Sequence, residues 1–147
     1  MHVIYQNIVE SVITISNIEW EQVVIWSAMD ETHSSIGVFY KLKGRFEWAE
    51  DLVEMGLLDE DSYNLVAFDL LDDIIELKEI TQEKGMNEWN SMYFSIKNDK
   101  KFDVNYSFEE WDETSMRDEI VWRYKYLNII PNEANMKYIE GVEQTLL

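Results

Sequence analysis

The chain has 147 residues, of which 46% are hydrophobic and 14% aromatic, so it can bury one sizeable core, and its lack of cysteine excludes disulfides and thiolate metal sites. Its 12 Lys and Arg residues against 30 Asp and Glu residues give a formal net charge of −18, which disfavours direct binding to nucleic acid or to an anionic membrane surface. The charge instead favours a basic protein, a cationic ligand or a metal ion as partner, with solubility alone as the open alternative.

The first half of the chain predicts one helix and then a meander of three strands. Apolar residues recur at four-residue spacing over residues 3–16, which is typical of a helix that packs on a core. Three runs rich in β-branched and aromatic residues predict antiparallel strands over residues 19–29, 36–42 and 45–48. The polar residues 30–35 and the pair Lys43-Gly44 predict turns, whereas residues 49–58 fit no element.

A long helix opens the second half. Acidic residues follow Asp59 and Gly85 lies just beyond the expected end, and both features are typical of helix boundaries. Apolar residues at spacings of three and four predict a buried stripe made of Tyr63, Ala67, Leu70, Leu71, Ile74 and Leu77.

The remaining chain predicts a second hairpin and two helices. The expected elements are strands over residues 89–96 and 101–108, a helix from Asp112 or Thr114 to about Leu127, and a helix from after Pro131 to Leu147. We therefore predict an α+β fold, in which an antiparallel β-sheet is covered by helices, as a single domain over residues 1–147.

Familiar catalytic motifs are missing from the sequence. It has no glycine-rich phosphate loop, no Gly-x-Ser-x-Gly elbow and no His-Glu-x-x-His helix, and its two histidines, His2 and His33, fall at the N-terminus and in a predicted turn. We predict a binding protein and not an enzyme, with no cofactor, no metal and no catalytic residue. A carboxylate-based or metal-dependent enzyme stays open as an alternative because acidic residues are abundant.

The acidic residues concentrate in two regions. Eleven of them lie between Phe46 and Leu77, a segment without Lys or Arg. In the long helix, spacings of three and four place one set of carboxylates on a face opposite the apolar stripe: Asp69, Asp72, Glu76, Glu79 and Glu83. A solvated outer face is the alternative to a functional one. We predict that this region binds a basic partner through Asp69, Asp72, Asp73, Glu76 and Glu79.

A second acidic cluster surrounds Trp111. Interface hot spots favour a tryptophan inside a polar rim. We therefore predict further partner contacts by Glu109, Glu110, Trp111, Asp112 and Glu113. The alternative, in which Trp111 packs under the following helix, stays open.

Several aromatic segments resemble a known family. Residues 89–94 (WNSMYF), 101–106 (KFDVNY) and 122–127 (WRYKYL), together with residues 19–23 (EWEQV) and the acidic helix, resemble the YezG-like immunity proteins. These proteins are antitoxins of bacterial polymorphic toxins and include the staphylococcal EsaG group. The likeness covers most of the chain and is weakest over residues 43–58.

The resemblance implies a cytoplasmic protein that neutralises the toxic C-terminal domain of a cognate toxin, commonly a nuclease of the LXG type. The absence of cysteine and of a secretory signal agrees with that compartment. A domain that holds a polyanionic substrate is basic, so an acidic inhibitor can cover the same surface, and complementary charge raises association rates to about 10⁸–10⁹ M⁻¹s⁻¹. The resemblance brings no catalytic residue, and an acidic nucleic-acid mimic is the alternative.

Overall fold

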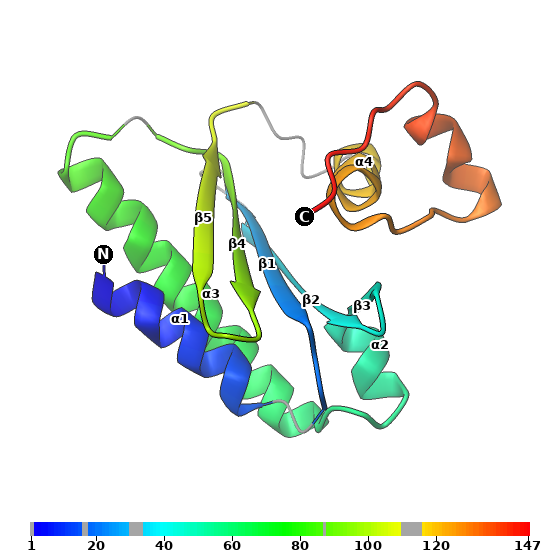
Figure 1. Ribbon diagram of the computed structural model, residues 1–147. Coiled ribbons are helices and arrows are strands. Elements are labelled where there is room, and N and C mark those ends of the chain that lie inside the picture. Colours follow the sequence, from blue (N-terminus) through cyan, green and yellow to red (C-terminus); the bar gives the residue numbers. More distant parts are fainter. Residues whose placement is uncertain (1, 16–17, 30–33, 87, 110–115) are drawn as a thin grey trace.

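Five strands form one antiparallel sheet in the order β3-β2-β1-β4-β5 (Figure 1). The computed structural model describes residues 2–15, 18–29, 34–86, 88–109 and 116–147. The elements are α1 (His2–Thr14), β1 (Gln22–Met29), β2 (Ser34–Leu42), β3 (Arg45–Trp48), α2 (Ala49–Glu54), α3 (Glu60–Glu83), β4 (Ser91–Lys97), β5 (Phe102–Ser107), α4 (Met116–Leu127) and the 3-10 helix η1 (Glu133–Ile139).

Strand β1 lies at the centre of the sheet and is buried throughout. Its Trp26 lies opposite Gly37 on β2 and Tyr93 on β4. A Cβ atom at Gly37 would lie 2.9 Å from the ring of Phe39, so any side chain there would force that buried ring to move. This register places large aromatic side chains together on one face of the sheet.

The other face of the sheet packs against α1 and α3, which lie side by side in Figure 1. Alternating residues of the strands point into this core, as the period of two requires. The contributors include Val23, Ile25, Met92, Phe94 and Ile96 from the strands and Ile8, Val12, Leu70, Ile74 and Leu77 from the helices. We call this side of the sheet its first face.

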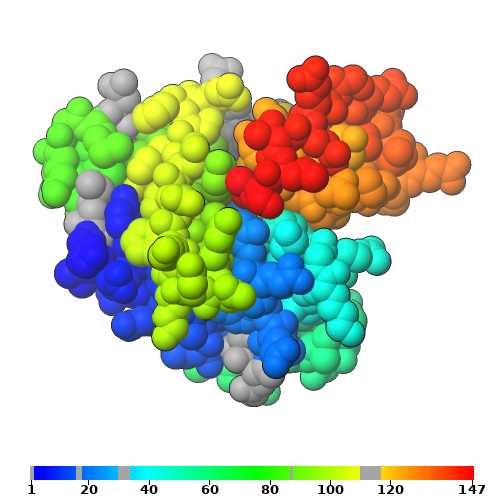
Figure 2. All heavy atoms as spheres, in the orientation of Figure 1, coloured from blue at the N-terminus to red at the C-terminus, as the bar shows by residue number. Residues whose placement is uncertain are grey.

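Helix α4 covers part of the second face through aromatic side chains. The Trp122 ring centroid lies 5.8 Å from that of Trp26 and 6.2 Å from that of Tyr93. The Arg123 guanidinium lies over the rings of Phe39 and Trp48, at 5.3 and 5.0 Å from their centroids. These side chains connect the C-terminal segment to the sheet, and Figure 2 shows that segment (orange to red) projecting beyond it.

The fold class and all five predicted strands are confirmed, as are α1 and α3. Helix α2 was not predicted because no side chain caps it at Trp48 and it has only 6 residues. Helix α4 was predicted to start at Asp112 or Thr114, and both residues lie outside the described part of the chain.

The predicted helix up to Leu147 is wrong. Only the 3-10 helix Glu133–Ile139 forms, and the segment after it is not helical but pairs with the end of α4. The backbone N–H of Thr145 donates to the Lys125 carbonyl at 2.9 Å, and that of Leu147 donates to the Tyr126 carbonyl at 3.0 Å. The last carbonyls of a helix have no partner inside it, so this tertiary pairing satisfies them.

Candidate functional site

Helix α3 starts at a defined cap. The Asp59 carboxylate accepts hydrogen bonds from the Ser62 backbone N–H at 3.0 Å and from the Ser62 hydroxyl at 2.8 Å, and these bonds lower the pKa of Asp59. Glu60 and Asp61 fill the first turn, where the helix dipole stabilises negative charge. The buried stripe sets the rotation of the helix against the sheet, so the positions opposite it point to solvent.

The predicted acidic stripe of α3 is exposed. Its members are Asp69, Asp72, Glu76, Glu79 and Glu83. None of the ion pairs formed within the described residues joins a carboxylate of this stripe to a Lys or Arg. The structure therefore leaves these charges available to an external partner.

Asp73, also predicted as a contact, differs from its neighbours because it is partly buried. It lines a hollow of about 520 Å³ between α1 and α3 together with Asp69, Asp72 and Glu10. Burial first, and then the negative charges of Glu76, Asp69 and Asp72, raise the pKa of Asp73 above its ordinary value. Its side chain therefore lies beside the stripe, at the edge toward α1.

Three large apolar side chains of α3 are exposed among these acids, and none of them is among the predicted contact residues. Leu65, Phe68 and Ile75 are 69%, 70% and 40% exposed. Leu65 and Phe68 are three positions apart, and Asp72 lies four positions after Phe68 and three before Ile75, so all four run along one side of the helix. The signal was present in the sequence as apolar residues that fall outside the buried stripe.

We call this combined surface the α3 outer face and define it as Leu65, Phe68, Asp69, Asp72, Ile75, Glu76 and Glu79. Protein interfaces place apolar anchors at the centre and polar groups around them. The α3 outer face has this composition.

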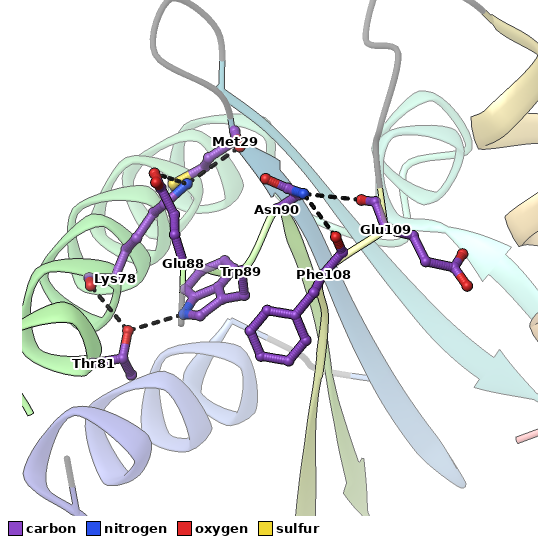
Figure 3. Close-up of polar contacts among 8 residues, drawn as sticks. All are labelled: Met29, Lys78, Thr81, Glu88, Trp89, Asn90, Phe108 and Glu109. Carbon is purple, nitrogen blue, oxygen red and sulfur yellow. Dashed lines mark hydrogen bonds and ion pairs between the residues drawn. The ribbon is translucent and has the colours of Figure 1, made fainter. Parts of the chain in front are cut away.

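The second predicted cluster is described only at Glu109. Its backbone carbonyl accepts a hydrogen bond from the Asn90 side chain at 3.0 Å, which fixes the chain as it leaves β5 (Figure 3). The other predicted contacts, Glu110, Trp111, Asp112 and Glu113, lie outside the described residues, so both hypotheses for Trp111 stay open. Glu109 lines a hollow between the second face and α4, whereas α3 covers the first face. Glu109 and the acidic stripe of α3 therefore lie on opposite sides of the sheet.

Comparison with known proteins assigns the chain to a family. Residues 1–140 match the sequence model of "Immunity protein YezG-like". The chain belongs to the YezG-like immunity protein family. It is also similar to the immunity protein YezG of Bacillus spizizenii (strain W23), with 20% identity over 139 residues that cover 91% of this chain and 86% of the relative. The family resemblance found from the aromatic segments is confirmed, and an immunity role follows.

Across the described residues, no three His, Cys, Asp or Glu side chains are grouped so as to hold a metal ion. In the same part of the chain, no helix is both long and apolar enough to cross a membrane. The features that the structure does supply are the α3 outer face and the hollow beside α4.

Proposed function

We propose that this YezG-like immunity protein binds the C-terminal nuclease domain of a cognate LXG-type polymorphic toxin and blocks it without catalysing a reaction. The contact surface is the α3 outer face. The protein acts in the cytoplasm of the cell that makes the toxin, where free nuclease would reach the cell's own nucleic acid.

The observation that carries the proposal is the composition of the α3 outer face. Four exposed carboxylates, Asp69, Asp72, Glu76 and Glu79, lie on the same face of the helix as Leu65, Phe68 and Ile75. A nuclease holds its substrate with Lys and Arg, so its binding surface complements these carboxylates. The apolar side chains supply the part of the contact that salt does not screen, because apolar burial does not depend on charge.

The overall charge supports the same partner. A formal net charge of −18 attracts a basic domain over distances up to about one Debye length, roughly 8 Å at physiological salt. Charge complementarity chiefly raises the association rate, and rapid capture is what an antitoxin needs.

The test is isolation of the partner followed by an inhibition assay. The tagged protein is captured from its source cells at low and high salt, and co-eluting proteins are identified by mass spectrometry. We expect a large protein with a basic C-terminal domain whose recovery falls as salt rises, and whose purified domain loses nuclease activity at one equivalent of the immunity protein.

Two controls separate this proposal from other functions. An unrelated basic nuclease should keep its activity, because a general nucleic-acid mimic would inhibit it as well. A captured toxin domain that cuts nucleic acid at an unchanged rate in the presence of excess immunity protein would contradict the proposal.

A further inference from the structure

The hollow between the second face and α4 has the composition of a binding site for a cation. Its volume is about 320 Å³, at the lower end of the range of about 300–1,000 Å³ that ligand pockets occupy. Its lining includes four aromatic residues and two acidic ones: Trp26, Tyr93, Trp122, Tyr126, Glu109 and Asp118.

The four aromatic rings form a continuous wall. Trp122 is the centre, with its ring centroid 5.8 Å from that of Trp26, 6.2 Å from that of Tyr93 and 5.5 Å from that of Tyr126. The planes of these pairs are inclined by 38° to 53°, so none of the pairs is stacked flat. The face of an aromatic ring attracts a cation through the ring's quadrupole.

Cations already lie on aromatic faces in this part of the molecule. The Lys125 ammonium lies 5.2 Å from the Tyr126 ring centroid, and the Arg123 guanidinium lies over Phe39 and Trp48 on the neighbouring part of the sheet. Lys125 also lines the hollow. Among the described residues that line it, the two acidic side chains, Glu109 and Asp118, outnumber the basic one.

The carboxylates come from two elements that the fold holds in place. The Asn90 side chain donates to the backbone carbonyls of Phe108 and Glu109, at 3.2 and 3.0 Å. Figure 3 shows the Glu109 side chain pointing away from Trp89, and this residue lines the hollow. Asp118 lies in the first turn of α4 and lines the same hollow. A carboxylate has several lone-pair sites, so it can accept from an incoming group besides its existing contacts.

We propose that this hollow receives an arginine side chain of a protein partner. A guanidinium is planar, stacks on aromatic rings and donates paired hydrogen bonds to carboxylates. An arginine side chain can therefore contact the aromatic wall and the two carboxylates at the same time. The hollow lies on the opposite side of the sheet from the α3 outer face. Its expected ligand, an arginine side chain, is of the basic kind that the α3 outer face also favours.

The test uses an arginine derivative with neutral ends, N-acetyl-arginine methylamide, and its neutral isostere N-acetyl-citrulline methylamide. Indole N–H resonances of the isotope-labelled protein are followed by nuclear magnetic resonance at low salt. We expect saturable shifts at Trp26 and Trp122 with the arginine compound, with Trp89 in the first-face core unmoved. Citrulline should bind at least about tenfold more weakly, because it has no charge for the rings to attract.

A pair of matched variants tests the carboxylates. The double variant Glu109→Gln with Asp118→Asn should weaken binding of the arginine compound at least about tenfold. The control, Glu140→Gln with Glu143→Gln, removes the same charge from exposed positions outside the hollow and should bind as the unmodified protein does. An unmoved Trp89 resonance reports that each variant is folded.

Three results would overturn the inference: no saturable shift at Trp26 and Trp122, equal binding of citrulline, or unchanged binding by the Glu109 and Asp118 variant. Each of these results leaves the proposed toxin partner untouched, because the probe is an amino-acid derivative and not the toxin.

Discussion

The indole Nε1 of Trp89 donates a 3.0 Å hydrogen bond to the hydroxyl of Thr81, and both side chains are fully buried. The bond joins the last turns of α3 to the residue that leads into β4 (Figure 3). Lys78, one turn earlier, lies over the Trp89 ring at 5.3 Å and donates to the Met29 carbonyl at 3.3 Å. The C-terminal part of α3 is therefore fixed to the sheet, and its outer face has a defined orientation.

Replacing Thr81 by Val should destabilise the fold. The variant keeps the shape of the side chain but leaves the Trp89 indole N–H buried without its acceptor, which costs about 1–3 kcal/mol. Denaturant unfolding followed by circular dichroism measures the loss. Thr81→Ser keeps the hydroxyl and is the control that should lose less. Equal stability of both variants and the unmodified protein would show that the bond contributes nothing.

Asp73→Asn should stabilise the protein at neutral pH. Burial and the charges of Glu76, Asp69 and Asp72 raise the pKa of Asp73, so its ionised form is disfavoured in the folded state. Relief of like-charge pairs at helical spacing contributes about 0.2–0.5 kcal/mol for each pair. Because the pKa of Asp73 is raised in the folded state, the ionised side chain destabilises the fold fully at pH values above that raised pKa. This destabilisation vanishes at pH values below the ordinary pKa of 3.8.

The pH dependence provides the control for Asp73. The stability difference between Asp73→Asn and the unmodified protein, measured by denaturant unfolding, should shrink as the pH falls toward 3.8. A stability difference between the two proteins that stays constant with pH would contradict the electrostatic explanation.

Stability should fall at alkaline pH because of Tyr63. Burial, followed by the nearby charge of Glu50, raises the pKa of Tyr63 from 10.0 to about 12. Between these pH values the unfolded chain releases the Tyr63 proton while the folded chain keeps it, so the free energy of unfolding decreases as the pH rises. Below pH 10 the contribution of Tyr63 to the free energy of unfolding is fully present. Tyr63→Phe cannot ionise and should lose stability less steeply.

Unfolding midpoints measured from neutral to alkaline pH check this slope. Burial also raises the pKa values of Tyr40 and Tyr106, so the Tyr63 variant should retain part of the alkaline loss. Parallel curves for the variant and the unmodified protein would show that Tyr63 ionises equally in both states.

Local signals in the sequence were sufficient for most of the fold. Lys43 and Gly44 form the predicted turn, and both adopt the left-handed φ values, 49° and 79°, that such a turn requires. Asp59 begins α3 through its bond to Ser62, as an N-cap does. These features depend on neighbours within a few residues, so one sequence carries them.

Features that depend on distant residues could not be predicted in this way. The C-terminal segment stays out of a helix because Thr145 and Leu147 bind carbonyls of α4, and no local pattern encodes that pairing. The hollow beside α4 combines Trp26 of β1 with Trp122 of α4, which lie far apart in the sequence. The exposed apolar residues of the α3 outer face differ from these features, because the position of Phe68 outside the predicted buried stripe is visible in the sequence.

Phe68→Ala should weaken toxin binding without reducing stability. The side chain is 70% exposed in the free protein, so its removal creates no core cavity, whereas an aromatic anchor at the centre of an interface contributes about 2 kcal/mol or more. Calorimetry with the purified toxin domain measures the affinity. Val3→Ala on α1, which is also 70% exposed, is the matched control. Unchanged affinity of the Phe68 variant would show that Phe68 does not contribute to the toxin interface.

Two charge-reversal variants of equal net charge test whether the α3 outer face binds the toxin. One replaces Asp69, Asp72, Glu76 and Glu79 with Lys, and the other replaces the exposed residues Glu54, Glu133, Glu140 and Glu143 with Lys. Both shift the formal charge from −18 to −10, since each exchange adds two charges (−18 + 4 × 2 = −10).

The measurement is the affinity of each folded variant for the toxin domain across a range of salt concentrations. We predict that the outer-face variant loses binding at every salt concentration, whereas the control binds with a slower association rate and nearly unchanged dissociation. Equal affinities of the two variants would contradict the claim, because only the total charge and not the α3 outer face would then determine binding.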